Sequence, residues 1–170
     1  MLADRRVCRK SISLAGLMYT KQEISKQKQA FWTAFGRYMK PVLSADGEEI
    51  SWINYKTGNK HVHFKMDADS RQAKIAIVLD HPEQGSRRMY YDRLLQMKPI
   101  FEDSIEEDDW TWSPEDVDEQ GRVVSVIQKQ LMGVNLFKNE DWPAIISFLK
   151  PRIMALDNFW SMVRYQFPGI

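Results

Sequence analysis

Apolar residues recur at helical spacing in the first long segment of the chain. These positions, separated mainly by Lys and Gln, are Ile24, Phe31, Phe35 and Tyr38 or Met39. Thr20-Lys-Gln-Glu23 precedes them and forms a capping box, in which the threonine hydroxyl accepts from the Glu23 amide and the glutamate reaches back. The pattern predicts a helix from about 21 to 39 that stops before Pro41.

Polar and apolar residues then alternate without interruption over residues 61–69. The polar positions are His61, His63, Lys65, Asp67 and Asp69, and the apolar ones are Val62, Phe64, Met66 and Ala68. Period two over nine residues predicts a half-buried antiparallel strand. Residues 50–55 and 74–80 are rich in strand-forming residues, so we expect three strands, with turns at 44–47, 56–59 and 69–72.

The register of the second and third strands follows from charge and hydrophobicity. Pairing Asp67 with Lys74 and His61 with Asp80 makes two favourable cross-strand pairs. The same register places three apolar pairs on one buried face: Val62 beside Leu79, Phe64 beside Ile77, and Met66 beside Ile75. A slip that set Lys65 opposite Lys74 would oppose like charges.

The second half of the chain predicts two more strands between helical segments. Ser86 is expected to cap a helix that restarts near 97–99 because of Pro99, and 106–109 end this element. Its apolar stripe is Tyr90, Leu94, Met97, Phe101 and Ile105. Next we expect a short strand at 110–112, an acidic loop at 113–121 and a strand at 122–128. A helix through 149 follows, and a last helix begins or is kinked at Pro151. The predicted fold is α+β in the order α-βββ-α-ββ-αα: a single domain with an antiparallel sheet and helices packed on one face.

The first seventeen residues differ from the rest in charge. Arg5, Arg6, Arg9 and Lys10 face only Asp4, so this segment has a net charge of +3 and leaves 1 − 3 = −2 for the remainder. A signal peptide is disfavoured because 11–18 is short and interrupted by serines. We therefore expect Met18 to be the biological start, 1–17 to be an N-terminal extension that is either wrongly included upstream sequence or a loose tail, and one domain at 18–170.

Composition excludes several classes of protein. With 44% apolar and 12% aromatic residues the chain has enough material for a core, so global disorder is excluded. No apolar stretch reaches the roughly 20 residues that span a bilayer, so no membrane insertion is expected. Cys8 is the only cysteine, which suits the cytoplasm. Basic and acidic residues are interspersed, so nucleic-acid binding is compatible with the sequence but not signalled by it.

The outer face of the three expected strands is the principal candidate site. Its residues are Trp52, Asn54, His61, His63, Lys65, Asp67, Lys74 and Asp80. His61 and His63 project from the same side, and with Asp80 they are candidate metal ligands, although no fourth ligand is evident. The alternatives are an ordinary solvated face and a polar binding surface anchored by Trp52. No cofactor is predicted.

Other candidates are weaker. Asp67 with Asp69, or the acids at 106–109, are paired carboxylates that equally suit a solvated turn. Trp32 falls off its helical stripe and, with one of Trp110 and Trp112, is a candidate partner contact, or simply covers the edge of the core. The Gly-rich phosphate loop, the Gly-x-Ser-x-Gly elbow and the His-Glu-x-x-His motif are absent from the sequence, so no catalytic residue is assigned.

The opening order of elements also matches the core of restriction-type nucleases. That chemistry needs an acid-x-Lys on the third strand to hold Mg²⁺ over a phosphate. Here the strand reads Ala73-Lys-Ile-Ala-Ile-Val-Leu-Asp80 and lacks that motif. A nuclease interpretation therefore survives only in a degenerate form.

Several segments resemble a bacterial family catalogued as domain of unknown function 4268. Two of them are Trp52-Ile-Asn-Tyr-Lys-Thr-Gly58 and Ala155-Leu-Asp-Asn-Phe-Trp160. The other matching segments are 29–36, 38–44, 64–69, 141–143 and 150–153. The similarity covers roughly 18–167. The resemblance implies no established activity, although some members look like additions to nuclease-like domains. Members often carry an acid between two apolar residues on the third strand, where this chain has Ala76.

The leading hypothesis is a non-enzymatic binding or regulatory module with a protein partner or self-association, such as a homodimer. It follows from a full core without a complete catalytic set. The alternative is a divergent metal-dependent nuclease-like or phosphodiesterase-like enzyme acting on nucleic acid. That alternative predicts a cleft in which Asp67, Asp69, Asp80 or His61 converge on one metal ion.

Overall fold

The structure, a computed structural model, describes residues 10–14 and 17–167. Within these ranges a small sheet pairs β1 (Lys10–Leu14) with β2 (Leu17–Thr20), and a four-stranded antiparallel sheet has the order β3-β4-β6-β5. Its strands are β3 (Val62–Ala68), β4 (Gln72–Leu79), β5 (Thr111–Val117) and β6 (Val123–Met132). The helices are α1 (Lys21–Met39), α2 (Gln84–Gln96), α3 (Lys98–Ile105) and α4 (Trp142–Val163), with short 3-10 turns η2 (Asn139–Asp141) and η3 (Arg164–Gln166). The α+β class is confirmed.

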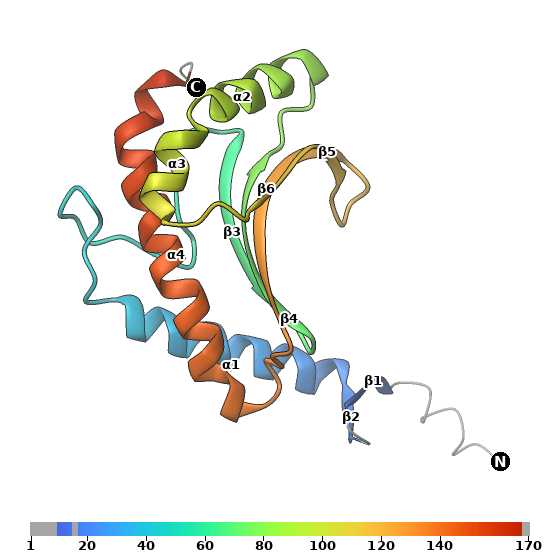
Figure 1. The fold of residues 1–170 in the computed structure, drawn as a ribbon. Helices are drawn as coiled ribbons and strands as arrows, with labels where there is room; N and C mark the ends of the chain where they lie inside the picture. Colours follow the sequence, from blue (N-terminus) through green and yellow to red (C-terminus); the bar gives the residue numbers. More distant parts are fainter. Residues whose placement is uncertain (1–9, 15–16, 168–170) are drawn as a thin grey trace.

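The helices lie on one side of the main sheet, and its other face is open (Figure 1). The sheet is curved, and its hollow side is the face without helices. The core fills the space between the sheet and α1, α3 and α4, and it includes Phe31, Leu79, Phe101, Ile127 and Phe159, each at most 1% exposed. No helix among the described residues has the length and apolar character needed to cross a membrane.

The first helix forms as its sequence predicts. The Glu23 amide donates to Thr20 Oγ1 at 3.1 Å, and the Thr20 amide donates to Glu23 Oε2 at 2.6 Å, so both halves of the capping box are present. Phe31, Phe35 and Met39 are buried on one face, which docks α1 against the core. The helix ends at Met39, before Pro41.

The predicted register of β3 and β4 is confirmed. Asp67 pairs with Lys74, and Val62, Phe64 and Met66 pair with Leu79, Ile77 and Ile75. The Asp80 amide donates to the His61 carbonyl at 3.2 Å, which continues the pairing one step beyond the strands. One face of this hairpin is therefore apolar, and the other carries its polar side chains together with Ala76 and Val78.

The expected strand at 50–55 is wrong. This segment is a loop, because its apolar side chains turn into the core instead of pairing along a sheet. Trp52 is 3% exposed, and its indole N–H donates to the Val42 carbonyl at 2.9 Å. The following turn is not a hairpin between strands, since the Thr57 hydroxyl donates to the Val62 carbonyl at 2.6 Å and Gly58 takes a φ of 79°.

The second half differs from the prediction at several boundaries. Helix α2 begins after Glu83 rather than at Ser86, whose hydroxyl instead donates to the Glu83 carboxylate. The restart before Pro99 is confirmed, because α2 and α3 meet at Met97. Most of the expected acidic loop at 113–121 belongs to β5, and the turn itself is closed by Asp118, which accepts from the Arg122 amide at 2.8 Å.

The expected pair of C-terminal helices is one helix, α4, which continues through Pro151. Leu149, Ile153 and Leu156 are all fully buried, so tertiary packing outweighs the hydrogen bond that proline removes. At the other end, the predicted extension at 1–17 falls mainly outside the described residues. Residues 10–14 form β1, and Met18 lies within β2.

Candidate anion-binding pocket

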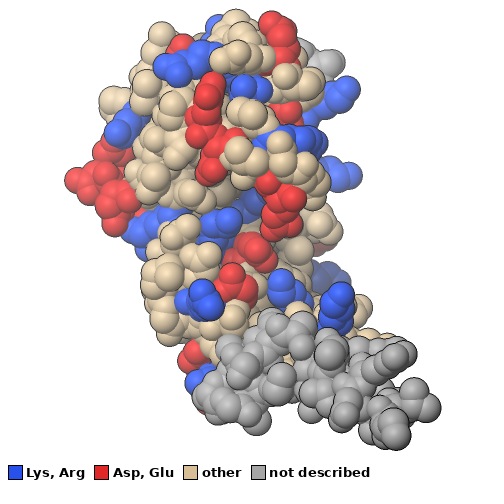
Figure 2. All heavy atoms as spheres, turned by 90° about the vertical axis from the view of Figure 1, so that its right-hand side faces the viewer, with Lys and Arg blue, Asp and Glu red and all other residues tan. Residues whose placement is uncertain are grey.

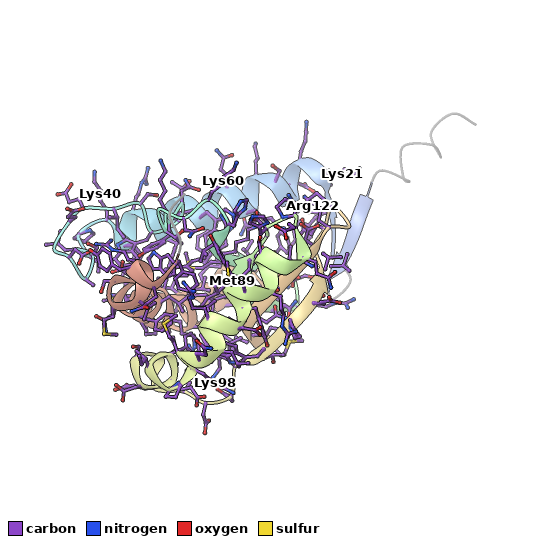
Figure 3. All side chains as sticks on the ribbon, turned by 90° about the horizontal axis from the view of Figure 1, so that it is seen from above. Lys21, Lys40, Lys60, Met89, Lys98 and Arg122 are labelled. Carbon is purple, nitrogen blue, oxygen red and sulfur yellow. The ribbon has the colours of Figure 1, made fainter. Side chains whose placement is uncertain are left out.

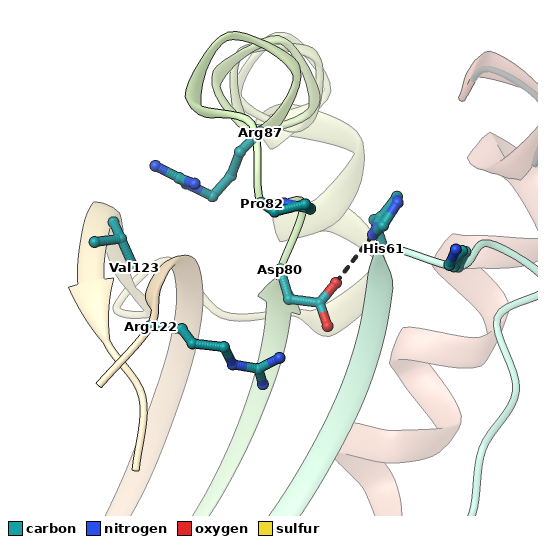
Figure 4. Close-up of a pocket in the computed structure, with 7 residues that line it drawn as sticks. His61, Asp80, Pro82, Arg87, Arg122 and Val123 are labelled. Carbon is teal, nitrogen blue, oxygen red and sulfur yellow. Dashed lines mark hydrogen bonds and ion pairs between the residues drawn. The ribbon is translucent and has the colours of Figure 1, made fainter. Parts of the chain in front are cut away.

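A hollow of 610 Å³ lies where β3 and β4 end, beside the start of β6 and below the beginning of α2 (Figure 4). It is lined by Lys60, His61, Asp80, Pro82, Arg87, Arg122 and Val123. The segments that supply these residues are far apart in the sequence. The antiparallel register of β3 and β4 brings Lys60 and His61 beside Asp80. Because β6 lies next to β4, the start of β6 adds Arg122 and Val123.

Two histidines hold the carboxylate of Asp80 in place. His61 Nδ1 lies 3.3 Å from Asp80 Oδ1, and His63 Nε2 lies 2.9 Å from Asp80 Oδ2, the latter without the in-line geometry of a hydrogen bond. The His61 ring also packs against the His81 ring at 4.2 Å between centroids. The Asp80 side chain keeps 20% of its surface exposed, so it is fixed in position yet accessible from the pocket.

Arg87 is the most unusual residue of this pocket. Only 5% of it is exposed, and its guanidinium donates to the His81 carbonyl at 3.0 Å. Within the described part of the chain, no carboxylate oxygen lies within the 4.0 Å of Arg87 that defines an ion pair. A buried cation is normally paired with an acid, because desolvating the charge is costly. Arg87 therefore brings an uncompensated positive charge to the pocket wall.

Two further cations line the pocket. Arg122 pairs with Asp118 at 2.8 Å, and its exposed side chain points across the pocket toward Asp80 (Figure 4). Lys60 is exposed, and no described carboxylate forms an ion pair with it. Seen from above, Lys60 and Arg122 lie on the same side of α2 (Figure 3). Three permanent cations and the carboxylate of Asp80 thus line the pocket, and Arg122 is paired with Asp118, which is not among the lining residues.

The sequence model of a protein family described as "Domain of unknown function (DUF4268)" matches residues 27–164. The chain belongs to this family. Every residue that lines the pocket falls within the matched region of the DUF4268 domain. Comparison with curated proteins and with solved structures gave no match.

The eight residues predicted as one surface lie in three different places of the DUF4268 domain. His61, His63 and Asp80 meet at the pocket end of the hairpin. Lys65, Asp67 and Lys74 follow along the same outer face, away from the pocket, and Asp67 and Lys74 form no ion pair although their backbones are opposite. Trp52 is in the core, and Asn54 lines a separate hollow beside Tyr55, because 50–55 is a loop. The sequence-based surface is therefore wrong for these last two residues.

Arg87 and Arg122 were missed by the sequence interpretation. A signal for Arg87 exists, because it lies three, four and seven residues before Tyr90, Tyr91 and Leu94, which are all buried on α2. A charged residue on the apolar stripe of a helix must find a partner or a special environment. Arg122 carries no comparable signal, since its position depends on the turn that Asp118 closes.

The predicted metal ligands do not form a metal site. Among the described residues, no group of three or more His, Cys, Asp or Glu side chains is arranged to hold a metal ion. Asp67 and Asp69 lie at the far end of β3 from Asp80, and Asp69 Oδ1 accepts from the Arg71 and Gln72 amides in the turn. The convergence of acids that the nuclease interpretation predicts is therefore not seen in the described part of the chain.

The acids at 106–109 serve a different arrangement, which we call the Glu107 network (Glu107, Asp109, Lys129 and Arg152). Arg152 donates to the Glu107 carboxylate, and Lys129 lies 3.1 Å from Glu107 and 2.8 Å from Asp109. Burial by itself raises the pKa of Glu107, but hydrogen bonds from Arg152, Trp110 and Lys129 outweigh it and lower that pKa below its ordinary value. Every charge in this network has an opposite partner.

The indoles considered as partner contacts belong to aromatic clusters. Trp32 packs edge-on against Phe31 and Phe35. Trp110 and Trp112 both pack edge-on against Phe101. Their contacts fit the alternative of covering the core.

Proposed function

We propose that this chain is a non-enzymatic binding module that takes an anionic group of its ligand in the pocket between α2 and the ends of β3 and β4. One observation carries the proposal. Arg87 is 95% buried at the wall of a 610 Å³ hollow without an acidic partner among the described residues. An anion in the pocket would supply the opposite charge that the fold does not.

The chemistry of the surrounding groups supports this assignment. Guanidinium groups present a rigid fork of donors that matches the oxygens of a carboxylate or a phosphate. Arg122 and Lys60 add positive charge from two other segments, and both remain exposed enough to reach a ligand. The pocket volume lies within the range of roughly 300–1,000 Å³ that is typical of small-molecule sites.

Two broader expectations are part of the proposal. A chain with a single cysteine suits a reducing compartment, so we place the module in the cytoplasm. We also expect a protein partner, or a second copy of the chain, to associate with the module when an anion occupies the pocket. Light scattering on the full chain, with and without phosphate, measures the oligomeric state directly.

Calorimetric titration with inorganic phosphate at constant ionic strength tests the anion site. We expect saturable binding that Arg87→Met weakens at least about tenfold, because a hydrogen-bonded charge in a desolvated site is lost. Arg88→Met is the matched control. Arg88 is the next residue of the same helix, pairs with Asp92 at 2.9 Å and has a side chain that is 56% exposed.

The two variants carry the same change in net charge, so a general electrostatic effect would weaken both equally. Equal affinity in wild type, R87M and R88M would contradict the proposal. So would the absence of saturable phosphate binding to the wild-type chain.

A further inference from the structure

We infer that the ligand of this pocket is a phosphorylated sugar, whose phosphate binds at Arg87 and whose vicinal hydroxyls donate to Asp80. This inference rests on the proposed anion-binding function and identifies the ligand's chemical class. Its basis is that a fixed, accessible carboxylate lines the same hollow as the three cations.

The carboxylate of Asp80 opposes simple anion binding, because it repels the charge that Arg87 attracts. Neither arginine of the pocket lies within ion-pair distance of it, and its described side-chain partners are the imidazoles of His61 and His63. An ionised carboxylate offers about four acceptor positions and no donor. The positions that the histidines leave free are exposed to the pocket and can accept from donors of a ligand.

Those donors are best supplied by hydroxyl groups. A ligand ammonium would lie among Lys60, Arg87 and Arg122, where like charges repel it. Hydroxyl groups carry no charge, and a pair of neighbouring hydroxyls can bond both oxygens of one carboxylate. An acid that accepts from sugar hydroxyls beside a phosphate site is a known solution in nucleotide-binding folds.

The surroundings favour a separate small ligand over a nucleic-acid strand. The outer face of β3, β4 and β6 continues from the pocket with His63, Lys65, Asp67, Lys74, Ala76, Val78, Val124, Val126, Gln128 and Gln130. None of these is Trp, Tyr or Phe, so the face offers no such ring on which successive bases would stack. Acidic and basic side chains are mixed across the open side of the molecule (Figure 2), without the continuous basic track that a phosphate backbone needs.

A ligand series on the wild-type chain tests the inference without any mutation. Calorimetric titration compares inorganic phosphate, ribose 5-phosphate and 2-deoxyribose 5-phosphate. We expect ribose 5-phosphate to bind about tenfold more tightly than inorganic phosphate, since each hydroxyl bonds a charged acceptor. The 2-deoxy sugar, which lacks the vicinal pair, should lose most of that gain.

Asp80→Asn then separates the two parts of the site. Removing the negative charge should tighten inorganic phosphate binding severalfold, while the preference for ribose 5-phosphate over its 2-deoxy analogue disappears. Asp67→Asn, on the same face of the hairpin but away from the pocket, is the matched control and should alter neither quantity. Thermal unfolding of both variants establishes that they are folded.

Each outcome is informative. Phosphate binding without any preference for the vicinal hydroxyls overturns the inference and leaves the anion site intact. No phosphate binding at all overturns both. AMP and dAMP identify the source of the sugar phosphate: AMP binding more tightly than ribose 5-phosphate supports a nucleotide, and equal affinity supports a free sugar phosphate.

Discussion

Two clusters of charged residues in this fold are built on opposite principles. In the Glu107 network, Glu107 lies between Arg152 and Lys129, and Asp109 takes a second contact from Lys129 at 2.8 Å. At the pocket, Arg87 is more deeply buried than Arg152, yet no described carboxylate pairs with it. The first cluster is closed on itself. The second leaves Arg87 without an acidic partner among the described residues.

The difference indicates what each cluster does. A closed network joins three elements, because Glu107 follows α3, Lys129 lies on β6 and Arg152 lies on α4. Its charges stabilise the packing of those elements. The open cluster contributes little to stability, because no described carboxylate offsets the cost of burying Arg87; in our proposal a bound anion does so. Loss of Arg152 should therefore reduce stability but not anion binding, whereas loss of Arg87 should reduce anion binding but not stability.

Matched arginine substitutions give the largest expected contrast. Arg152→Met should lower the free energy of unfolding by about 2 kcal/mol, because Glu107 loses its closest cation in a partly buried site. Arg87→Met should leave that free energy unchanged or raise it by up to about 1 kcal/mol, since a desolvated charge is removed. Urea denaturation of the two variants and wild type measures both changes. A larger loss in R87M than in R152M would reverse the roles we assign.

Acid should weaken the closed cluster in a defined direction. The pKa of Glu107 is lower in the folded chain than its ordinary value of 4.5, so the folded state favours the ionised carboxylate. Its contribution to stability is fully present above about pH 4.5 and is lost as the pH falls through the folded value. The free energy of unfolding of the wild type should therefore decrease as the pH is lowered below 4.5.

Glu107→Gln separates this effect from the titration of the other carboxylates. The variant should be less stable near pH 7, and the gap to wild type should close as the pH falls. Urea denaturation at a series of pH values measures the gap. A gap that stays constant from pH 7 to pH 3 would mean that the charge of Glu107 makes no contribution.

The sequence predicted the parts of the fold that depend on local pattern. Strict alternation defined β3 and, with charge pairing, its register with β4, which brought His61 and Asp80 together. The same reasoning failed at 50–55, because strand propensity does not tell whether Trp52 packs into a core or lines a sheet. It also missed Arg87 and Arg122, whose convergence depends on how α2 and β6 pack around the hairpin, and that is tertiary information.

The smallest expected effect distinguishes the two ends of the β3–β4 hairpin. Both ends were predicted from the same cross-strand rule, yet Asp80 is held by two histidines while Asp67 and Lys74 form no ion pair. Asp67→Asn should therefore change the free energy of unfolding by less than about 0.5 kcal/mol, as solvent screens an exposed charge. Its phosphate affinity should equal that of wild type. A stability loss in D67N as large as that in D80N would show that the histidine contacts add nothing beyond strand pairing, and Asp80 would then have no distinct role at the pocket.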